Sequence, residues 1–518
     1  KARGLRVIAN AGGVNPSACA AALRAEAQAQ GVDLRIAVVT GDDLTDRAAE
    51  FAAAGITEMF TGAPFPEPGR IASINAYLGA FPIAAALDQG ADIVVTGRCV
   101  DSAVTLAACI HSFGWRARDF DLLSAGSLAG HLLECGPQAT GGNFTDWRMA
   151  GPLDAVGYPI AEIDAAGVTV ISKPEGTSGV VSRLSVAEQL VYEIDDPARY
   201  LLPDVACDFS GVAIEEVGAD RVRVSGAKGA PPSASYKVSA TYADGWRGGA
   251  LLQMDGLEAR AKAEAFGDAA LTRARHRLRA ANAPDFDDVS VEVLGGDAAA
   301  AFSVAARHRS AEGVAALLKE ITGLALATPP GLAIYSVAGR PKPSPVVRLF
   351  SFLTPKADVA IAIDLGGAPQ PFRAPEVSET GAARAVVSEP EPFAATLGDE
   401  EMALTPLIDL AVARSGDKGD RANIGVIARR PEHLPTLWAA LDEDLLRRVF
   451  GGFSPSAVRR YAMPGPGALN IVLDDALGGG GVASLRLDAQ GKAFAQRLLA
   501  TPIPVPRRLL ADLTGDRA

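Results

Sequence analysis

Cysteine and histidine are scarce in this sequence of 518 residues. The five cysteines show no CxxC spacing, and the five histidines form no HExxH motif. Zinc sites and disulfide frameworks need such regularly spaced ligands. We therefore expect no bound metal and no disulfides, and the cysteine usage predicts a reducing compartment, the cytoplasm.

An excess of basic charge and long apolar runs are also lacking. Lys and Arg number 49 against 61 Asp and Glu, a net charge of −12, so we expect no nucleic-acid partner. No apolar run reaches the roughly 20 residues of a membrane span, and the start does not have the form of a signal peptide. The chain starts at Lys1 and enters a strand-like segment at once, so we expect an N-terminal stretch to be missing.

The composition that is present, 48% hydrophobic and 21% charged, is typical of a folded protein with several domains. Strand-like runs at 6–9, 34–39, 56–60 and 91–96 alternate with helical patterns at 17–23, 44–54, 71–90 and 103–111. This alternation predicts an α/β main domain with a parallel sheet flanked by helices. Pro82 is expected to kink the helix 71–90, and short β-type runs at 156–260 predict a mixed β-rich insertion.

The chain divides into three segments. We predict a main domain at 1–365, a linker at 366–402, rich in Pro, Ala and Glu, and a small α+β companion domain at 403–510. In the companion domain, strands are expected at 406–415, 422–429, 468–477 and 482–491, with a helix at 434–450.

Polar turns follow three of the predicted parallel strands, where open α/β sheets bind ligands. An anion-binding or substrate-binding pocket is predicted from these turns; its residues are Gly12, Gly13, Asn15, Asp42, Asp43, Arg98 and Ser102. Asn75, in the motif 75–80, is a further candidate, as a buried polar anchor for a substrate carbonyl. These residues also have alternative, structural roles. Residues 10–16 would form an ordinary strand-to-helix turn with Ser17 as N-cap, Asp42 or Asp43 would cap the following helix, and Arg98 would pair with Asp101. Asp101 is otherwise a candidate catalytic base, and Asn75 satisfies loop backbone in its alternative role.

Residues 131–142 form the most enzyme-like stretch. Glu134 at a helix end is a candidate general acid/base, and Cys135 is a candidate nucleophile if a cation or dipole stabilises its thiolate. The glycine loop that follows is a candidate substrate contact through Thr140, Gly141 and Gly142. The alternatives are a small buried cysteine and a satisfied histidine at 131, which lies one helical turn from Glu134.

Two lysines lie in polar loops. Lys173, in the loop 172–182, would stabilise an enolate or thioester oxygen, or else is a solvated turn residue. Lys418, in the turn 415–420 of the companion domain, would reach an acidic group on the ligand or on the main domain. A hairpin or domain contact without catalysis would use the same residues.

Several motifs together resemble one known family. They are NAGGVNP at 10–16, NAYLGA at 75–80, GADIVVTGRCVDS at 90–102, GHLLECGPQATGGNF at 130–144, KPEGTSG at 173–179, EQLVYEIDDPARYLLPDV at 188–205 and ARSGDKGDRANIG at 413–425. In this order they resemble the acyclic terpene utilisation family of AtuA-like proteins, over residue 9 to about residue 504. The resemblance implies a main domain, a ferredoxin-like companion domain, and a role beside the acyl-CoA carboxylases, dehydrogenases and hydratases that degrade isoprenoid and branched acids. It implies no catalytic residues. Members usually carry a further N-terminal glycine-rich stretch, which is missing here.

These observations predict a cytoplasmic, homo-oligomeric enzyme that acts on an acyl-CoA or a related branched acid by lyase or hydratase chemistry. A carboxylate would remove the proton α to a thioester, and coenzyme A, as part of the substrate, would place its phosphates over residues 10–16. Two alternatives remain: a non-catalytic accessory or scaffold subunit that partners an acyl-CoA carboxylase, and hydrolysis at Cys135.

Overall fold

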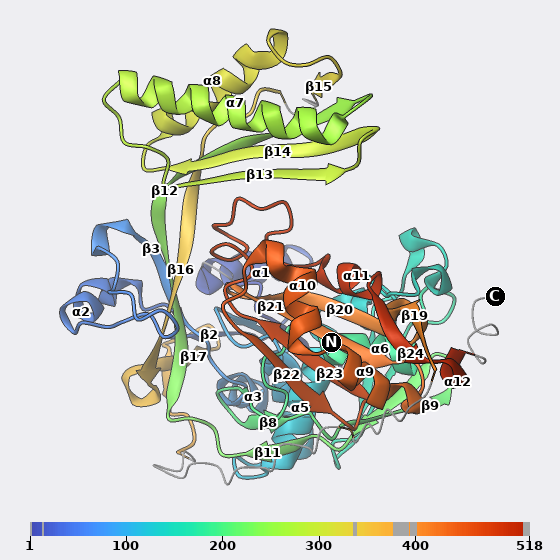
Figure 1. Ribbon diagram of the computed structural model, residues 1–518. Helices are drawn as coiled ribbons and strands as arrows, with labels where there is room; N and C mark the ends of the chain where they lie inside the picture. The colour runs from blue at the N-terminus through green and yellow to red at the C-terminus, as the bar shows by residue number, and fades with distance from the viewer. Residues whose placement is uncertain (1–2, 13–14, 335–338, 377–392, 394–400, 511–518) are drawn as a thin grey trace.

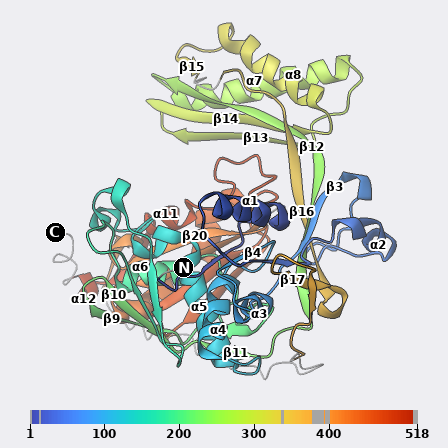
Figure 2. The ribbon, with the colours of Figure 1, turned by 180° about the vertical axis from the view of Figure 1, so that it is seen from behind.

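The computed structural model describes residues 3–12, 15–334, 339–376, 393 and 401–510. Figure 1 shows three parts: a body built mainly from the N-terminal half, a ribbon that rises from it to a separate unit of helices and strands, and a C-terminal domain packed against the body. Figure 2 shows the same arrangement from behind.

A small parallel sheet lies at the centre of the body. Strands β1 (Val7–Ala9), β4 (Ile93–Thr96) and β2 (Ile36–Thr40) pair in parallel, and β17 (Ile361–Asp364) and β18 (Gln370–Phe372) extend the sheet in antiparallel fashion. Alternate residues of β2 face opposite sides: Ile36 and Val38 pack with Ala20 of helix α1 (Pro16–Ala29), and Ala37 and Val39 enter the main core. This two-sided burial explains why the strand sequence is apolar throughout.

Parallel pairing is confined to these three strands. All other strand pairs of the described residues are antiparallel, so the predicted class is correct as a mixture of helices and sheets, and the parallel sheet is much smaller than expected. No strand forms at 56–60; instead β3 (Ile71–Ala76) takes up part of the predicted helix and pairs with a different sheet. Pro82 does not kink a helix, because helix α3 (Phe81–Asp88) begins beside it, where proline is tolerated.

Helices α2 (Ala48–Ala53), α4 (Ala103–Phe113) and α5 (Phe120–Glu134) complete this part of the body. The expected β-rich insertion follows. It contains one antiparallel sheet of β5 (Ile160–Ile163), β6 (Thr169–Ser172), β10 (Arg221–Ser225) and β9 (Ala213–Gly218), and a second of β11 (Lys228–Ala230), β8 (Ala206–Asp208) and β7 (Tyr200–Leu201). Helix α6 (Arg183–Leu190) is buried between this region and the C-terminal domain.

A long ribbon leads to the distal unit. Strand β12 (Ser235–Asp255) pairs with β16 (Ser344–Pro355) and β3 in the body, and with β14 (Ala299–His308) and β15 (Leu332–Ile334) further along. Strand β13 (Asp288–Gly295) forms the outer edge of the distal sheet, and helices α7 (Ala259–Ala280) and α8 (Ala311–Gly323) cover one face, as Figure 1 shows. Phe266, Phe302 and Leu317 are buried in a separate core there.

The C-terminal domain is an antiparallel sheet with helices on one side. Its strand order is β20 (Ala411–Lys418), β21 (Arg421–Ala428), β23 (Ala468–Leu473) and β22 (Val458–Met463). The helices are α9 (Leu434–Ala440), α10 (Glu443–Phe450), α11 (Phe494–Leu499) and α12 (Arg507–Leu510), and β19 (Met402–Pro406) pairs with β24 (Pro502–Pro506).

The predicted strand 482–491 is wrong, since these residues form turns, and β22 is the missing fourth strand. The expected linker begins inside the body, where β18 forms; residues 377–392 and 394–400 lie outside the described residues.

The other face of the C-terminal sheet packs against the body. At Gly425 an added Cβ would lie 2.0 Å from Cγ2 of Val191, so only glycine allows this close approach. Val412, Ile427, Met463 and Ala468 of this domain belong to the core of the body. The two domains therefore share one continuous hydrophobic core.

Candidate functional site

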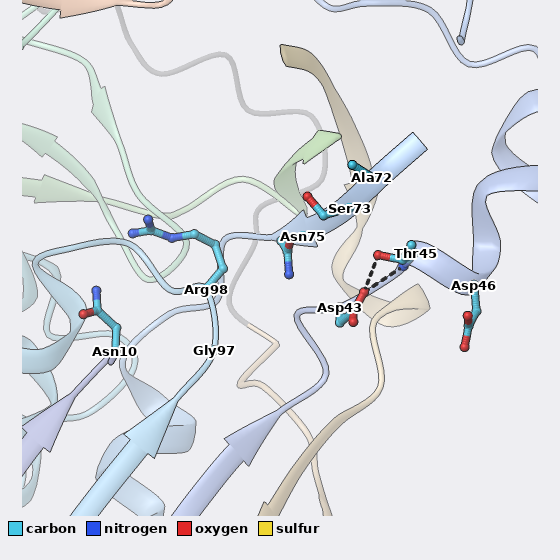
Figure 3. Close-up of a pocket in the computed structure, with 9 residues that line it drawn as sticks. All are labelled: Asn10, Asp43, Thr45, Asp46, Ala72, Ser73, Asn75, Gly97 and Arg98. Atoms are coloured by element: carbon cyan, nitrogen blue, oxygen red, sulfur yellow. Dashed lines mark hydrogen bonds between the residues drawn. The ribbon is translucent and has the colours of Figure 1, made fainter. Parts of the chain in front are cut away.

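A pocket of about 470 Å³ lies beyond the carboxyl ends of the parallel strands (Figure 3). Residues that follow β1, β4 and β2 line it together with β3; they are Asn10, Gly97, Arg98, Asp43, Thr45, Asp46, Ala72, Ser73 and Asn75. This volume is within the range of small-molecule sites. The structure thus brings Asp43, Asn75 and Arg98 together at the edge where the sequence places a ligand.

Asp42 holds two of the pocket-lining residues, Asn75 and Arg98, by hydrogen bonds. The carboxylate is buried and accepts hydrogen bonds from the Arg98 backbone N–H at 2.7 Å and from the Asn75 amide at 3.0 Å. Burial raises the pKa of Asp42, and these two hydrogen bonds oppose the rise. An added Cβ at Gly97 would lie 2.2 Å from Oδ1 of Asp42, so glycine is required there. Asp42 therefore holds two strand-end loops together, while its neighbour Asp43 is exposed and accepts from Thr45.

Arg98 leads away from the pocket. In Figure 3 its side chain extends away from Asp43 and Thr45. The guanidinium donates to the Cys99 carbonyl at 2.8 Å, pairs with Asp101 and lies 4.9 Å from the ring centroid of Tyr77. The expected Arg98–Asp101 ion pair is thus present. Burial alone would lower the pKa of Arg98, but Asp101 raises it overall.

Lys418 occupies a second polar space, on the domain boundary. The turn between β20 and β21 carries it into the body, where its Nζ lies 5.6 Å from the ring centroid of Tyr200. Glu193, Glu134 and Asp101 act on it electrostatically, as does the cation of Lys237, which lies over Tyr77. We call this set of residues the Lys418 recess: Tyr77, Asp101, Glu134, Glu193, Tyr200, Lys237 and Lys418. Arg98 joins the recess to the strand-end pocket, because it lines the pocket and pairs with Asp101.

The ammonium of Lys418 is enclosed but reachable. Its side chain is exposed to solvent, and its Nζ lies over the ring of Tyr200. Burial opposes its charge, but attraction from Tyr200, Glu193, Glu134 and Asp101 outweighs this effect and raises the pKa of Lys418. Within the described part of the chain, no carboxylate oxygen lies within 4.0 Å of its Nζ. Lys418 is therefore a cation in position to accept an anionic group.

Glu193 is neutralised by a different lysine. Lys492 Nζ lies 2.7 Å from its carboxylate and 3.3 Å from Asp417, and also donates to the Tyr192 hydroxyl. Burial would raise the pKa of Glu193, but the hydrogen bond from Lys492 lowers it overall. The charge of Glu193 is thus balanced by Lys492 and not by Lys418.

Glu134 is paired with His131 at the end of α5. The Nε2 of His131 faces the Leu190 carbonyl at 3.1 Å, so this nitrogen carries a hydrogen and donates it. The Nδ1 lies 3.1 Å from Glu134 Oε1, and one of these two atoms must hold a proton for them to hydrogen-bond. The histidine ring is 1% exposed and the Glu134 side chain 18% exposed. The pair lies close to Tyr200, whose ring centroid is 5.9 Å from that of His131 and whose pKa is raised to about 12, chiefly by burial.

The other predicted residues of this region have packing or hydrogen-bonding roles. Thr140 donates to the Gly157 carbonyl, and the Gly142 carbonyl accepts from Arg414 at 3.1 Å. An added Cβ at Gly141 would lie 3.0 Å from the Val180 nitrogen. Burial raises the pKa of the Cys135 thiol, the opposite of what a nucleophilic thiolate needs.

Lys173 donates to the Thr177 carbonyl at 2.9 Å and pairs with Asp220 at 3.1 Å. No described contact joins it to the Lys418 recess.

The loop that follows β1 packs closely against neighbouring backbone. An added Cβ at Gly12 would lie 2.8 Å from the Thr96 carbonyl oxygen, and Gly13 lies outside the described residues. Asn15, not the expected Ser17, caps α1, accepting the Ala18 N–H at 2.9 Å. Ser102 is buried against Gly130 of α5.

Sequence reasoning missed Tyr77, Glu193, Tyr200 and Lys237. Glu193 and Tyr200 lie inside the motif at 188–205, but nothing in its spacing indicates chemistry. Their relation to Lys418 depends on how the two domains pack, so a single sequence carries no local signal for it.

The described residues contain no group of three or more His, Cys, Asp or Glu side chains placed to hold a metal ion. Among the helices that the structure describes, none combines the length and the apolar character needed to cross a bilayer.

The fold and this recess define an α/β protein whose polar centre is shared between its main body and a small C-terminal domain. Family models match both parts: the acyclic terpene utilisation family protein AtuA over residues 1–365, and the AtuA ferredoxin-like domain over residues 405–504. The chain belongs to the acyclic terpene utilisation AtuA family, as the motifs predict. No curated protein matches it significantly.

Proposed function

We propose that the chain is an enzyme of acyclic terpene or branched-acid breakdown that acts on an acyl thioester, such as an acyl-CoA, or on a related carboxylic acid. The Lys418 recess is its reaction site, and the reaction is the loss or addition of water next to the carbonyl group. The observation that carries the proposal is the Lys418 ammonium, which lies beside Glu134 and Tyr200 without a carboxylate partner within 4.0 Å among the described residues.

The residues of the recess fit this chemistry. A cation stabilises the negative charge that develops on a thioester oxygen when the α-proton leaves, which is the role first considered for Lys173. Lys418 takes this role, since the ammonium of Lys173 is already paired with Asp220. Asn75 would orient the acyl part of the substrate in the adjoining pocket.

Glu134 serves as the base. Its carboxylate takes the α-proton, the electron pair of the C–H bond forms the enolate, and Lys418 stabilises the enolate oxygen. The enolate then re-forms the carbonyl and expels the β-hydroxyl, which leaves as water with the proton that Glu134 took up. The products are an unsaturated thioester and water, and Glu134 returns to its starting state. His131 is a positioning residue, since it fixes the Glu134 carboxylate from the buried side.

Exchange of the α-proton tests this assignment before the natural substrate is known. Branched acyl thioesters incubated with the protein in D₂O should gain deuterium at the α-carbon, as measured by mass spectrometry. Glu134→Gln should abolish the exchange, and Glu175→Gln, which alters an exposed carboxylate elsewhere, should leave it unchanged. No exchange with any thioester or acid of the panel, or equal exchange in Glu134→Gln, contradicts the proposal. Retention of a biotin-dependent carboxylase without exchange would favour the accessory-subunit alternative.

A further inference from the structure

Three arginines converge on one carboxylate where the ribbon joins the distal unit. Asp244 of β12 lies 2.8 Å from Arg70, 3.0 Å from Arg307 and 2.5 Å from Arg348. Arg70 directly precedes β3, Arg307 belongs to β14 and Arg348 to β16. We call Arg70, Asp244, Arg307 and Arg348 the arginine cluster.

The arginine cluster carries more positive charge than its own carboxylate can balance. In the described ranges, no other carboxylate oxygen lies within 4.0 Å of any of its three arginines. The Nε atom of Arg307 is buried without a hydrogen-bond partner. The side chains of Arg70 and Arg348 are 43% and 31% exposed, so a ligand can reach them. A surplus of partly exposed arginines is an arrangement that recognises phosphate, because each guanidinium can donate two parallel hydrogen bonds.

A glycine-rich loop lies between the arginine cluster and the Lys418 recess. This loop, 478–481, leaves the C-terminal domain after β23 and reaches toward the distal unit (Figure 1). An ideal Cβ at Gly479 would lie 3.9 Å from Nη1 of Arg348, and one at Gly480 would lie 2.9 Å from the Gly419 carbonyl oxygen. Gly419 directly follows Lys418. The loop therefore lies next to Arg348 and next to the residue that follows Lys418.

From this arrangement we infer that the arginine cluster binds a phosphate or diphosphate group of the ligand whose reacting end lies at Lys418. This assignment rests on the proposed function, in that it makes the substrate a phosphorylated carrier thioester rather than a free acid. It places the phosphates beside the ribbon and the loop 478–481, not over residues 10–16, where Gly12 packs against protein backbone.

Inorganic pyrophosphate is the first probe, since it needs no acyl group. Calorimetry should show binding to the wild-type chain that weakens as salt rises. Arg348→Gln and Arg70→Gln should each weaken binding about tenfold, the loss expected when a charged hydrogen bond is removed. Arg309→Gln is the matched control: this arginine is 71% exposed in the same unit but lies outside the cluster, and its substitution should change nothing. Circular dichroism shows whether each variant is folded.

Asp244→Asn separates binding from a purely structural ion-pair network. Removing this carboxylate should strengthen pyrophosphate binding, because it increases the surplus positive charge, even if the variant melts at a lower temperature. Absence of pyrophosphate binding to the wild type, or equal binding by Arg348→Gln, Arg70→Gln and Arg309→Gln, overturns the inference.

Coenzyme A distinguishes a carrier from free phosphate. It should displace pyrophosphate, whereas pantetheine, which lacks the diphosphate, should not. Displacement together with absent α-proton exchange would leave the phosphate site standing and refute the proposed reaction. Exchange of the α-proton on unphosphorylated acids, without any phosphate binding, would refute the phosphate site and leave the proposed reaction standing.

Discussion

Lys418 in the C-terminal domain lies over the ring of Tyr200 in the main domain, with 5.6 Å between its Nζ and the ring centroid. The turn that carries Lys418 is fixed by the sheet behind it, and this sheet shares a core with the body. The small domain therefore contributes directly to the polar centre, and the separate main domain would lack Lys418.

Separating the two domains should be costly because of a buried ion pair. Arg414 of β20 lies 2.8 Å from Glu188 of α6, and their side chains are 5% and 0% exposed. Arg414 also donates to Gln138 at 2.6 Å. Glu188→Gln leaves the arginine buried without its counter-ion, and we expect a loss of about 3–5 kcal/mol of stability. Urea unfolding followed by tryptophan fluorescence measures it. A loss below about 1 kcal/mol would show that this pair does not hold the domains together.

Gly97 is predicted to be intolerant of a side chain. Alanine would place its Cβ 2.2 Å from Oδ1 of Asp42 and disturb both strand-end loops, so Gly97→Ala should cost about 1–3 kcal/mol. Gly69→Ala is the control, since its Cβ would meet nothing within 4 Å. Thermal unfolding gives the melting temperature of each variant, and that of Gly97→Ala should be the lower. Equal melting temperatures would mean that Asp42 can move without consequence.

Asp204 should make stability depend on pH. It is buried and accepts the Ala80 N–H at 2.7 Å, and burial raises its pKa to about 6 from 3.8. A raised pKa favours the protonated folded state, so the stabilisation is complete below pH 3.8 and is lost as pH rises through 6. This shift corresponds to at most about 3 kcal/mol.

Asp204→Asn removes this titration while keeping an acceptor for Ala80. The stability of the variant relative to the wild type should therefore rise between pH 5 and pH 8, as measured by urea unfolding at each pH. A constant difference across this range would show that Asp204 does not titrate there.

Cys135 should react slowly with alkylating reagents. Burial raises the pKa of its thiol, so little thiolate is present at pH 7.5. Peptide mass spectrometry after iodoacetamide treatment should show modification slower than that of free cysteine. Modification faster than free cysteine would instead support the hydrolytic alternative at this residue.

The sequence predicts best what depends on local patterns. The strands around 36–40 and 93–96 are uniformly apolar because both faces of the sheet are covered, and that pattern is visible without a structure. It also places Asp43 and Arg98 near one another, since strand ends share an edge, whereas Asn75 joins them only because β3 pairs with β12. The motifs identify the family correctly.

What the sequence could not predict depends on distant pairing. Residues 71–76 look helical but become a strand because β12 offers an edge to them, a tertiary effect that overrides local preference. Lys418 was recognised as a residue that would reach the main domain, but its neighbours Tyr200 and Glu193 follow only from domain packing. The sequence also does not show that Lys173 is engaged, because its ion pair joins it to Asp220, which is distant in the chain.

The turnover of Lys418→Gln is the most direct test of the account. A branched 3-hydroxyacyl or 2-enoyl thioester that the wild type converts is followed by the ultraviolet absorbance of the conjugated product or substrate. Lys418→Gln should lower kcat about 10²- to 10³-fold, as expected for loss of one oxyanion-stabilising donor, while Lys319→Gln on the exposed surface of α8 should match the wild type. A folded Lys418→Gln variant with unchanged kcat would contradict the claim that the recess is the reaction site.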